Sequence, residues 1–360
     1  MSKNTLISYH PGEYISDALE AMNMSQQEFA ARSGISVKNL STLINGKSNI
    51  TFEVAEKLAA FFHNGVDFWT NLQNRYESYL IQERKEQERK DDWNIVRYFD
   101  KAFLKNVCEI DPDNGDRQAV ISRLTDLFMV SSLQYLKNED MFAFYKTNIT
   151  KPASEKETIL RNAWISLAMK KANGQSCASY DPDKLKALLP ELKKMTRMDL
   201  KDGTPLLSEK FGAVGIKFIE LPYLKNSNVR GVTKWIANEN CILIAVNDCG
   251  KAVDKIWFTI FHELGHALKN HKRHMTISTD NDDGYEETQA NRFAEDQLID
   301  PDHFASFIRR NRFGWEDIKY FAETEEIAEA IVIGRLEKEG LIPYGSYNRY
   351  QNRYHIQEKE

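Results

Sequence analysis

An apolar stretch in the last third of the chain contains two histidines and a glutamate. A folded protein normally buries such a stretch, and buried positions normally carry apolar side chains. Residues 256–268 read IWFTIFHELGHAL, with His262, Glu263 and His266 inside the stretch. Residues four apart lie on one face of a helix, so both imidazoles can reach one tetrahedral metal ion. Glu263 then lies beside the ion, where it can hold a water molecule and accept its proton. The stretch predicts a buried metal-binding helix; the alternative is a core helix whose histidines only pack.

The residues that follow limit the class of metal site. A metzincin has glycine three residues and histidine six residues after the second histidine. This chain has Lys269 and Lys272 at those positions, which excludes that class. His271 and His274 lie in KNHKRHM, a segment typical of a polar loop, and they are minor candidates for the third ligand.

A second helix-forming segment, YEETQANRFAED, offers the principal candidate for the third ligand. Glu287 follows His266 by 21 residues, and a glutamate ligand is what a gluzincin-type site needs. We predict that Asn291, one helical turn later, accepts a hydrogen bond from the free ring nitrogen of His266 and so fixes its tautomer. Glu286 is the rival ligand. The alternative role for Glu287 is that of an exposed first-turn glutamate that complements the helix dipole.

The first eighty residues consist of short helix-forming segments separated by turn signals. Ser25 and Glu28 form a capping-box pattern for a helix that stops at Gly34, and Ser36 caps a second helix that ends at Asn45. Two capped helices joined by a tight turn fit a helix-turn-helix, whose second helix lies in the major groove of DNA. A small helical bundle without DNA binding is the alternative.

The side chains predicted to face DNA form two groups. The predicted base contacts are Val37, Lys38, Ser41 and Thr42, and the predicted phosphate contacts are Gln26, Ser36, Asn45 and Lys47. The whole chain has a net charge of −5, and residues 1–80 contain six lysines and arginines against eight aspartates and glutamates. DNA binding therefore has to come from a local patch, doubled by dimerisation.

The hydrophobic pattern changes near residue 210 from helical to strand-like. Residues 214–222, 231–237 and 241–248 are β-branched or aromatic runs bounded by turn residues, which predicts strands of an antiparallel sheet. Residues 93–200 are helical by pattern, and the charged run 81–92 predicts a solvated helix. We predict a multidomain chain with an all-α helix-turn-helix domain at 1–80, a helical connector at 81–155, and an α+β zincin-like domain with a C-terminal helical extension at 156–360.

The composition of the chain limits the cellular compartment in which it is expected to act. No apolar run reaches the roughly 20 residues that a membrane span needs, and no charged-then-apolar leader opens the chain. The four cysteines are scattered without a CxxC pair, which suits a reducing compartment. We expect a soluble, cytoplasmic protein without a membrane partner.

The two metal-site segments together resemble the ImmA/IrrE family of metallopeptidases. NENCILIAVND and IWFTIFHELGHAL, followed by EETQANRFAEDQLIDP, have that family's pattern over about residues 210–302, with mild departures at Gln289 and in DQLIDP. The resemblance implies a catalytic base and three Zn²⁺ ligands, which are Glu263 and His262, His266 and Glu287. The pattern assigns no oxyanion-stabilising group, and Tyr285 is the one candidate for that role.

The N-terminal segment resembles the HigA-type antitoxins of the XRE helix-turn-helix family. The stretches HPGE, SQQEFA, INGK and FWTNLQNRYE carry the resemblance over about residues 9–78, and the tail IVIGRLEKEGLIP matches the ending of proteins that fuse the two modules. The resemblance implies a homodimer that reads a short operator in double-stranded DNA. A toxin encoded nearby is a further expected partner.

Together the resemblances imply a transcriptional regulator with a zinc-dependent endopeptidase that relieves repression. Its protein substrate would be a repressor or antitoxin, or this chain itself, cut in cis or within a dimer. The expected trigger is DNA damage or induction of a phage or mobile element, with single-stranded DNA or another damage signal as inducer. We expect the cut segment to add as a strand beside residues 231–237 or 241–248. The alternative is an antitoxin-like repressor whose zinc domain only senses a signal or binds a partner.

Overall fold

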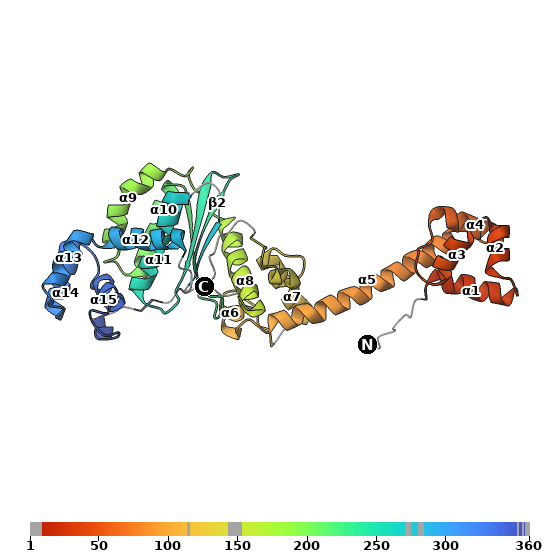
Figure 1. The fold of residues 1–360 in the computed structure, drawn as a ribbon, viewed down its shortest axis with the longest axis horizontal. Helices are drawn as coiled ribbons and strands as arrows, with labels where there is room; N and C mark the ends of the chain where they lie inside the picture. The colour runs from red at the N-terminus through yellow and green to blue at the C-terminus, as the bar shows by residue number, and fades with distance from the viewer. Residues whose placement is uncertain are drawn as a thin grey trace. The chain divides into compact units, whose positions relative to one another are not determined.

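A computed structural model describes residues 9–113, 116–142, 153–270, 275–279, 284–350, 353, 354 and 356 of the chain. The chain divides into two compact units, Met1–Asp91 and Asp92–Glu360, which are described separately (Figure 1).

The first unit is a helical bundle held by one apolar core. Its helices are α1 (Pro11–Ala21), α2 (Gln26–Ser33), α3 (Val37–Ile44), α4 (Phe52–Phe62) and the first part of α5 (Val66–Val96). The predicted caps are confirmed, because the Ser25 hydroxyl accepts from the Glu28 amide at 3.1 Å and the Ser36 hydroxyl from the Asn39 amide at 3.2 Å. Gly34 ends α2 in the left-handed region, at a φ of 73°. These caps fix the lengths of α2 and α3, the two helices of the predicted helix-turn-helix.

A close backbone contact sets the packing of α1 against α3. A Cβ atom on Gly12 would lie 2.0 Å from the Leu43 carbonyl oxygen, so no larger residue fits there without displacing a helix. Phe29, Leu40 and Leu58 are fully buried beneath this contact and join α2, α3 and α4. The same core therefore holds α3 in place and leaves its opposite face exposed.

The second unit is built on a mixed sheet. Its described strands are β1 (Ile216–Leu221), β2 (Val229–Ile236), β3 (Cys241–Asn247) and β4 (Met275–Thr279), in the order β1-β3-β2-β4. β2 pairs antiparallel with β3 and with β4, but β1 pairs parallel with β3. The prediction of a wholly antiparallel sheet is therefore wrong for β1. The chain reverses before β2 and again before β3, and β3 then lies between β1 and β2, parallel to β1.

Helices cover both faces of this sheet (Figure 1). The cluster on one face draws on α9 (Pro182–Met195), α10 (Leu200–Ala213), α11 (Val253–Asn270), α12 (Tyr285–Leu298), α13 (Pro301–Arg309), α14 (Trp315–Glu325) and α15 (Glu329–Lys338). The cluster on the other face draws on α6 (Lys101–Asn106), α7 (Arg117–Phe128), the 3₁₀ turn η1 (Leu133–Lys137), α8 (Glu155–Ala172) and the end of α5; a second 3₁₀ turn, η2 (Asn348–Tyr350), lies near the C-terminus. β3 is buried on both sides, with Ile242 and Ile244 in the first cluster and Leu243 and Ala245 in the second.

Within residues 81–155, predicted as a connector, the described residues from Asp92 onward pack in the second unit. Phe99, Phe103 and Phe128 are buried in the same cluster as Leu243 of the sheet. Residues from Asp92 onward therefore belong to the second unit, because their apolar side chains complete the core on one face of the sheet.

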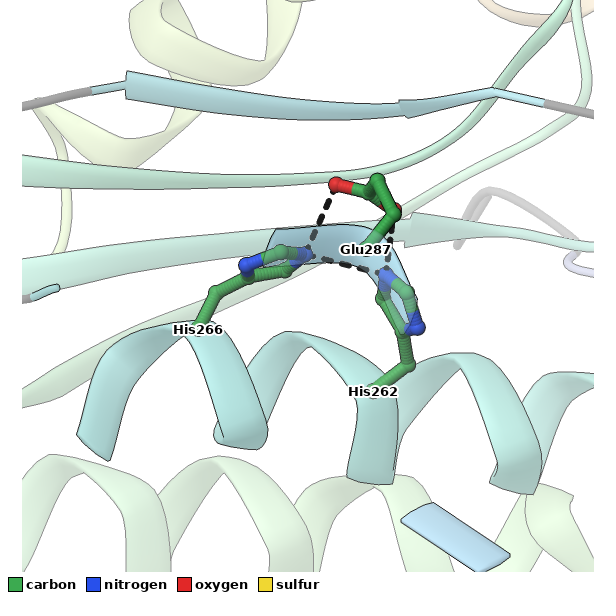
Figure 2. A group of neighbouring side chains, drawn as sticks. All are labelled: His262, His266 and Glu287. Atoms are coloured by element: carbon green, nitrogen blue, oxygen red, sulfur yellow. Dashed lines mark hydrogen bonds and ion pairs between the residues drawn. The ribbon is translucent and has the colours of Figure 1, made fainter. Parts of the chain in front are cut away.

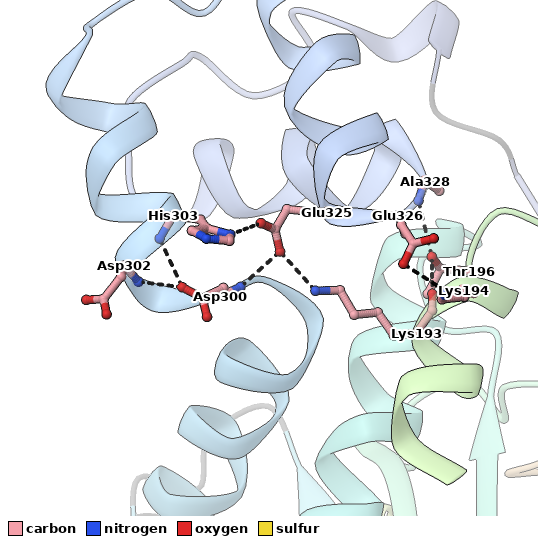
Figure 3. A network of polar contacts seen from close by, with 9 residues as sticks. All are labelled: Lys193, Lys194, Thr196, Asp300, Asp302, His303, Glu325, Glu326 and Ala328. Atoms are coloured by element: carbon pink, nitrogen blue, oxygen red, sulfur yellow. Dashed lines mark hydrogen bonds and ion pairs between the residues drawn. The ribbon is translucent and has the colours of Figure 1, made fainter. Parts of the chain in front are cut away.

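A buried carboxylate joins three helices at the C-terminal end of the second unit (Figure 3). Glu325, at the end of α14, contacts Lys193 Nζ from α9 at 2.9 Å and His303 Nδ1 from α13 at 2.6 Å, and it accepts from the Asp300 amide at 3.2 Å. Burial raises the pKa of Glu325, but the hydrogen bonds from Lys193 and His303 outweigh burial and hold the pKa below its ordinary value. The neighbouring Glu326 pairs with Lys194 at 2.9 Å, and both of these side chains are more than half exposed.

Glutamine at position 325 is expected to lower the free energy of unfolding by about 1–3 kcal/mol, because the largely buried Lys193 ammonium then faces a neutral amide in place of the Glu325 carboxylate. Glu326→Gln, the matched control one residue away, is expected to cost less than about 0.5 kcal/mol, since its ion pair is solvated. Urea unfolding at pH 7, followed by tryptophan fluorescence, measures both. Equal losses for the two variants would contradict the role given to Glu325.

A second carboxylate, Glu220 on β1, is partly buried, and no cation contacts it among the described residues. The Thr204 hydroxyl donates to it at 3.2 Å. Burial raises the pKa of Glu220 to about 7; the Thr204 hydrogen bond lowers it slightly and the nearby Asp248 carboxylate adds to the rise.

Because of this raised pKa, the folded protein retains a proton on Glu220 between about pH 4.5 and 7 that the unfolded chain releases. Stability is therefore expected to fall as the pH rises through this window. Glu220→Gln should raise the free energy of unfolding at pH 8 by about 1–3 kcal/mol and leave it almost unchanged at pH 4. Urea titrations at the two pH values test this. An equal gain at both would show that packing, not ionisation, is responsible.

Candidate metal centre and DNA interface

Two neighbouring helices bring His262, His266 and Glu287 to one point (Figure 2). The two histidines lie one turn apart on α11, and Glu287 lies in the first turn of α12. The Nε2 atoms of the histidines are 3.0 Å apart, and the carboxylate oxygens of Glu287 lie 2.9 Å from His262 Nε2 and 3.0 Å from His266 Nε2. All three side chains are buried. The rival candidate Glu286 is half-buried on the next face of α12.

Gly265 explains why the two helices approach so closely. A Cβ atom at this position would lie 3.0 Å from a ring carbon of Phe293 and 3.3 Å from the Cα of Ala290, both on α12. The glycine of HELGH thus allows α12 to lie against α11. Glu287, three residues before Ala290, then reaches the histidine pair.

The donor set fits a single metal ion. His262 Nε2 has three polar neighbours within 3.1 Å, namely His266 Nε2, Glu287 Oε2 and Ser278 Oγ. One ring nitrogen can make only one hydrogen bond, so these contacts cannot all be satisfied by protons. Ligands of a tetrahedral ion with bonds of about 2.0–2.1 Å lie roughly 3.3 Å apart, close to the separations found here. Two imidazoles and one carboxylate are also the ligand types that zinc prefers.

The electrostatics of the site agree with that fit. Burial raises the pKa of Glu287, but its hydrogen bonds to His262 and His266 outweigh burial and lower the pKa to about 2. Burial lowers the pKa of His262, but the hydrogen bond to Glu287 and the charges of Glu263 and Glu287 outweigh burial. The pKa of His262 is therefore raised above its ordinary value. Glu287 is therefore ionised at neutral pH, as a metal ligand must be.

The outer hydrogen bond of the site differs from the prediction. Asn291 Oδ1 lies 2.9 Å from Nδ1 of His262, not of His266. Asn291 is four residues after Glu287 on α12 and so lies on the same helix face as the carboxylate, beside the earlier histidine. Sequence spacing placed the amide on the correct helix face but did not determine which imidazole it meets. His271 and His274, the minor candidates for the third ligand, lie outside the described residues.

Glu263 is fully buried next to the histidine pair. Its Oε2 accepts a hydrogen bond from the Thr233 hydroxyl and its Oε1 one from the Ser278 hydroxyl, each at 2.6 Å. Burial raises the pKa of Glu263, while His266 and His262 lower it and the two hydroxyls lower it further. Thr233 and Ser278 were not among the predicted site residues. No motif or spacing marks the two positions, because they meet Glu263 only in the folded sheet.

A pocket of about 580 Å³ adjoins the site on the side of His262. Ser278 and Asn291 line the pocket near the metal-binding residues, and Phe258 and Ile331 line it between α11 and α15. Tyr285, the predicted oxyanion candidate, is 77% exposed at the start of α12 and is not among the residues that line this pocket.

The edge of the sheet near the site is β4. β2 and β3 each pair with a strand on both sides, so a peptide cannot add beside residues 231–237 or 241–248 as expected from the sequence. β4 is the last strand in the sheet order and contains Ser278. Backbone pairing positions next to the site are therefore found on β4.

In the first unit, α3 presents part of its surface to solvent. The predicted DNA contacts Gln26, Ser36, Val37, Lys38, Asn45 and Lys47 are exposed, and Ser41 and Thr42 are half-buried. The Ser36 hydroxyl is engaged in capping α3, and the Asn45 side chain donates to the Ser41 carbonyl at 2.7 Å. Val37 is 45% exposed, which is unusual for a valine and leaves an apolar group for a base edge.

A known protein family matches part of each unit of the chain. The helix-turn-helix family matches residues 15–69. A peptidase family described as the IrrE N-terminal-like domain matches residues 212–335, a range that contains His262, Glu263, His266 and Glu287. None of the helices in the described part of the chain combines the length and apolar character needed to cross a membrane.

Individual relatives match the first unit. An uncharacterized HTH-type transcriptional regulator of Escherichia coli K12, YddM, is 36% identical over 66 residues, which are 18% of this chain and 70% of that protein. An addiction module antidote protein of the HigA family from Coxiella burnetii is 28% identical, with 23% of this chain and 92% of that chain covered and a TM-score of 0.22. A protein described as an antidote of a plasmid maintenance system from Nostoc punctiforme is 35% identical, with 22% and 88% covered and a TM-score of 0.21.

The expected helix-turn-helix domain and the expected IrrE-like domain are thus confirmed by the family matches and the curated relative. The chain belongs to the helix-turn-helix transcriptional regulators and carries, in its second unit, a peptidase domain of the IrrE N-terminal-like family.

Proposed function

We propose that this protein is a transcriptional regulator whose second unit is a zinc-dependent endopeptidase that relieves repression by cutting a regulator. The observation that carries the proposal is the convergence of His262, His266 and Glu287 next to the buried Glu263 carboxylate. A bound zinc ion supplies a Lewis acid that polarises a peptide carbonyl and acidifies water. His262, His266 and Glu287 hold it, and Asn291 orients the imidazole of His262.

In this proposal Glu263 moves the protons. Each carboxylate oxygen has two lone pairs, so Oε1 can accept from an attacking water while it also accepts from Ser278. The carboxylate takes the water proton and later gives it to the departing amine. The raised pKa of Glu263 favours holding that proton between the two events.

The substrate segment is proposed to pair with the outer side of β4, the last of the described strands in the sheet order. Added there, an extended peptide runs past Ser278 and presents its carbonyl to the histidine pair, with a side chain directed into the pocket beside Phe258. Pairing with β4 requires an extended segment of the substrate. A linker, or a helix that has locally unfolded, can supply such a segment.

The first unit is proposed to bind a double-stranded operator as a homodimer, with α3 in the major groove. Val37 and Lys38 are the exposed candidates for base contacts, and Gln26 and Lys47 for phosphates. The substrate is this chain itself, in cis or within the dimer, or a partner repressor. Induction follows stress such as DNA damage or mobilisation of a phage.

The purified protein tests the proposal directly. It is incubated with zinc, alone and with single-stranded DNA or cell extract, and intact mass spectrometry follows the products. The proposal expects fragments in at least one condition, either of this chain, beginning after residue 80, or of a partner repressor supplied by the extract. A chain that stays intact in every condition, with a nearby toxin as its partner, would instead support a repressor with a sensing domain.

Mixing separates cleavage in cis from cleavage between chains. A mass-tagged Glu263→Gln protein is incubated with untagged wild type under cleaving conditions. Cleavage of the tagged chain shows that one chain cuts another. An intact tagged chain beside cleaved wild type shows cleavage in cis.

A further inference from the structure

The carboxylate of Glu263 is held by hydroxyls from two neighbouring strands. Thr233 on β2 donates to Oε2 and Ser278 on β4 donates to Oε1, and both oxygen–oxygen distances are 2.6 Å. Glu263 is 0% exposed, and Thr233 and Ser278 are 5% and 4% exposed. Short hydrogen bonds to an ionised group are about twice as strong as neutral ones, and a buried anion without them is costly.

The register of the sheet accounts for this arrangement. Gly231 is the cross-strand partner of Ser278, and Thr233 is the partner of Thr276. Residues two apart on a strand face the same side, so Gly231, Thr233 and Ser278 all face α11. A Cβ atom on Gly231 would lie 2.3 Å from Oε1 of Glu263. The missing side chain of Gly231 leaves the space that the Glu263 carboxylate fills. The Thr233 and Ser278 hydroxyls each donate a hydrogen bond to one oxygen of that carboxylate.

We call Gly231, Thr233 and Ser278 the glutamate cup. The cup also orients the carboxylate, because the Ser278 oxygen lies 3.1 Å from His262 Nε2 as well as 2.6 Å from Oε1. Oε1 is therefore the oxygen on the side of the metal-binding atoms. Oε2 is directed the other way, toward Thr233.

We infer that Thr233 and Ser278 are positioning residues for the proton transfer that Glu263 performs, an inference that rests on the proposed peptidase function. Fixing both oxygens removes the rotation of the carboxylate and keeps Oε1 next to the reacting water. On the same face of β3, the inward positions that only pack carry Ile242, Ile244 and Val246. The Thr233 and Ser278 hydroxyls are instead the hydrogen-bond donors of the Glu263 carboxylate.

The first test compares kinetics in the full-length zinc-loaded protein. Thr233→Val and Ser278→Ala are each expected to lower kcat about 10- to 100-fold with KM nearly unchanged when the tagged Glu263→Gln chain is the substrate, because the loss falls on proton transfer and not on substrate binding. If cleavage is in cis, the first-order rate of fragment formation should fall by the same factor. Thr233→Ser, which keeps the hydroxyl, should recover most of the rate. Thr276→Val is the matched control, a buried threonine on the same face of β4 with the same methyl-for-hydroxyl change, and it should retain the wild-type kcat.

The second test needs no enzymatic activity. In the metal-free full-length protein, Thr233→Val is expected to lower the urea midpoint, because it leaves the buried carboxylate with one partner fewer. In a Glu263→Leu background the same change should lower the midpoint by less, because the Thr233 hydroxyl then loses only its contact with the backbone carbonyl of residue 263, 3.2 Å away. Equal losses in both backgrounds would show that Thr233 only packs.

The outcomes separate the inference from the proposed function. If wild-type protein cleaves nothing while Thr233→Val lowers the urea midpoint less in the Glu263→Leu background than in wild type, the cup exists but the peptidase proposal fails. If wild type cleaves and Thr233→Val and Ser278→Ala match it in kcat, the positioning role is wrong and the peptidase proposal stands. Loss of rate in Thr276→Val equal to that in Thr233→Val would also overturn the inference.

Discussion

Replacement of Glu263 by glutamine is expected to stop fragment formation while the protein stays folded and keeps its metal. The amide has the shape of the carboxylate, and its oxygen can still accept from one of the two hydroxyls, Thr233 or Ser278. It cannot accept a proton, so the transfer from water is lost. General-base catalysis contributes typically about 10²- to 10⁴-fold to a rate, and we expect a loss near the upper end.

The measurement is a time course of intact mass under the conditions in which wild type is cut, together with zinc content by elemental analysis. Glu209→Gln makes the same chemical change on an exposed position of α10 and should cleave like wild type. Fragments that appear in Glu263→Gln at the wild-type rate would point to a contaminating protease or another base. Loss of zinc from the variant would mean that its inactivity says nothing about proton transfer.

The local features of the site were predictable because they depend on spacing along one helix. Two histidines four residues apart must share a helix face, and the structure places His262 and His266 side by side. The same rule put Asn291 on the face of Glu287. It could not say which histidine Asn291 would meet, because that depends on how α12 lies across α11, and the contact of Gly265 with Ala290 and Phe293 sets this.

The sheet shows what sequence pattern leaves open. Runs of β-branched residues located β1, β2 and β3, and turns between them gave the reversals of direction. Neither signal gives the order of strands, so β1 was expected to be antiparallel and a substrate was expected beside strands that prove to be internal. β4 was not predicted at all, and with it Ser278 was missed. Glu263 and its two hydroxyl partners come from three elements, and only the folded sheet brings them together.

The N-terminal unit was the most predictable part, since its signals are local. Ser25 and Ser36 cap the helices that the sequence indicated, and Gly34 ends α2 in the conformation that glycine favours. The boundary after residue 80 was less predictable. A charged run looks the same whether it joins two domains or continues one helix, and α5 passes through it without a break.

Removal of the Glu287 side chain is expected to weaken zinc binding by more than the roughly 10- to 100-fold that loss of an outer hydrogen-bonding partner costs. Glu287 supplies the only carboxylate among the three convergent side chains of the described structure, and the two imidazoles alone carry no negative charge to offset the ion. Glu287→Ala is measured by competition with a chelator of known affinity. The metal-dependent rise in melting temperature should shrink in parallel.

Glu286→Ala is the matched control, because it removes the same group one residue earlier on α12. The two positions differ by about 100° around the helix, so only Glu287 turns toward α11. Glu286 is half-buried and lies outside the convergent group, and its replacement should leave zinc affinity within about twofold of wild type. An equal or larger loss in Glu286→Ala would reverse the assignment of the third ligand. Such a result would mean that α12 turns when metal binds, because one helix face cannot present both side chains to the same ion.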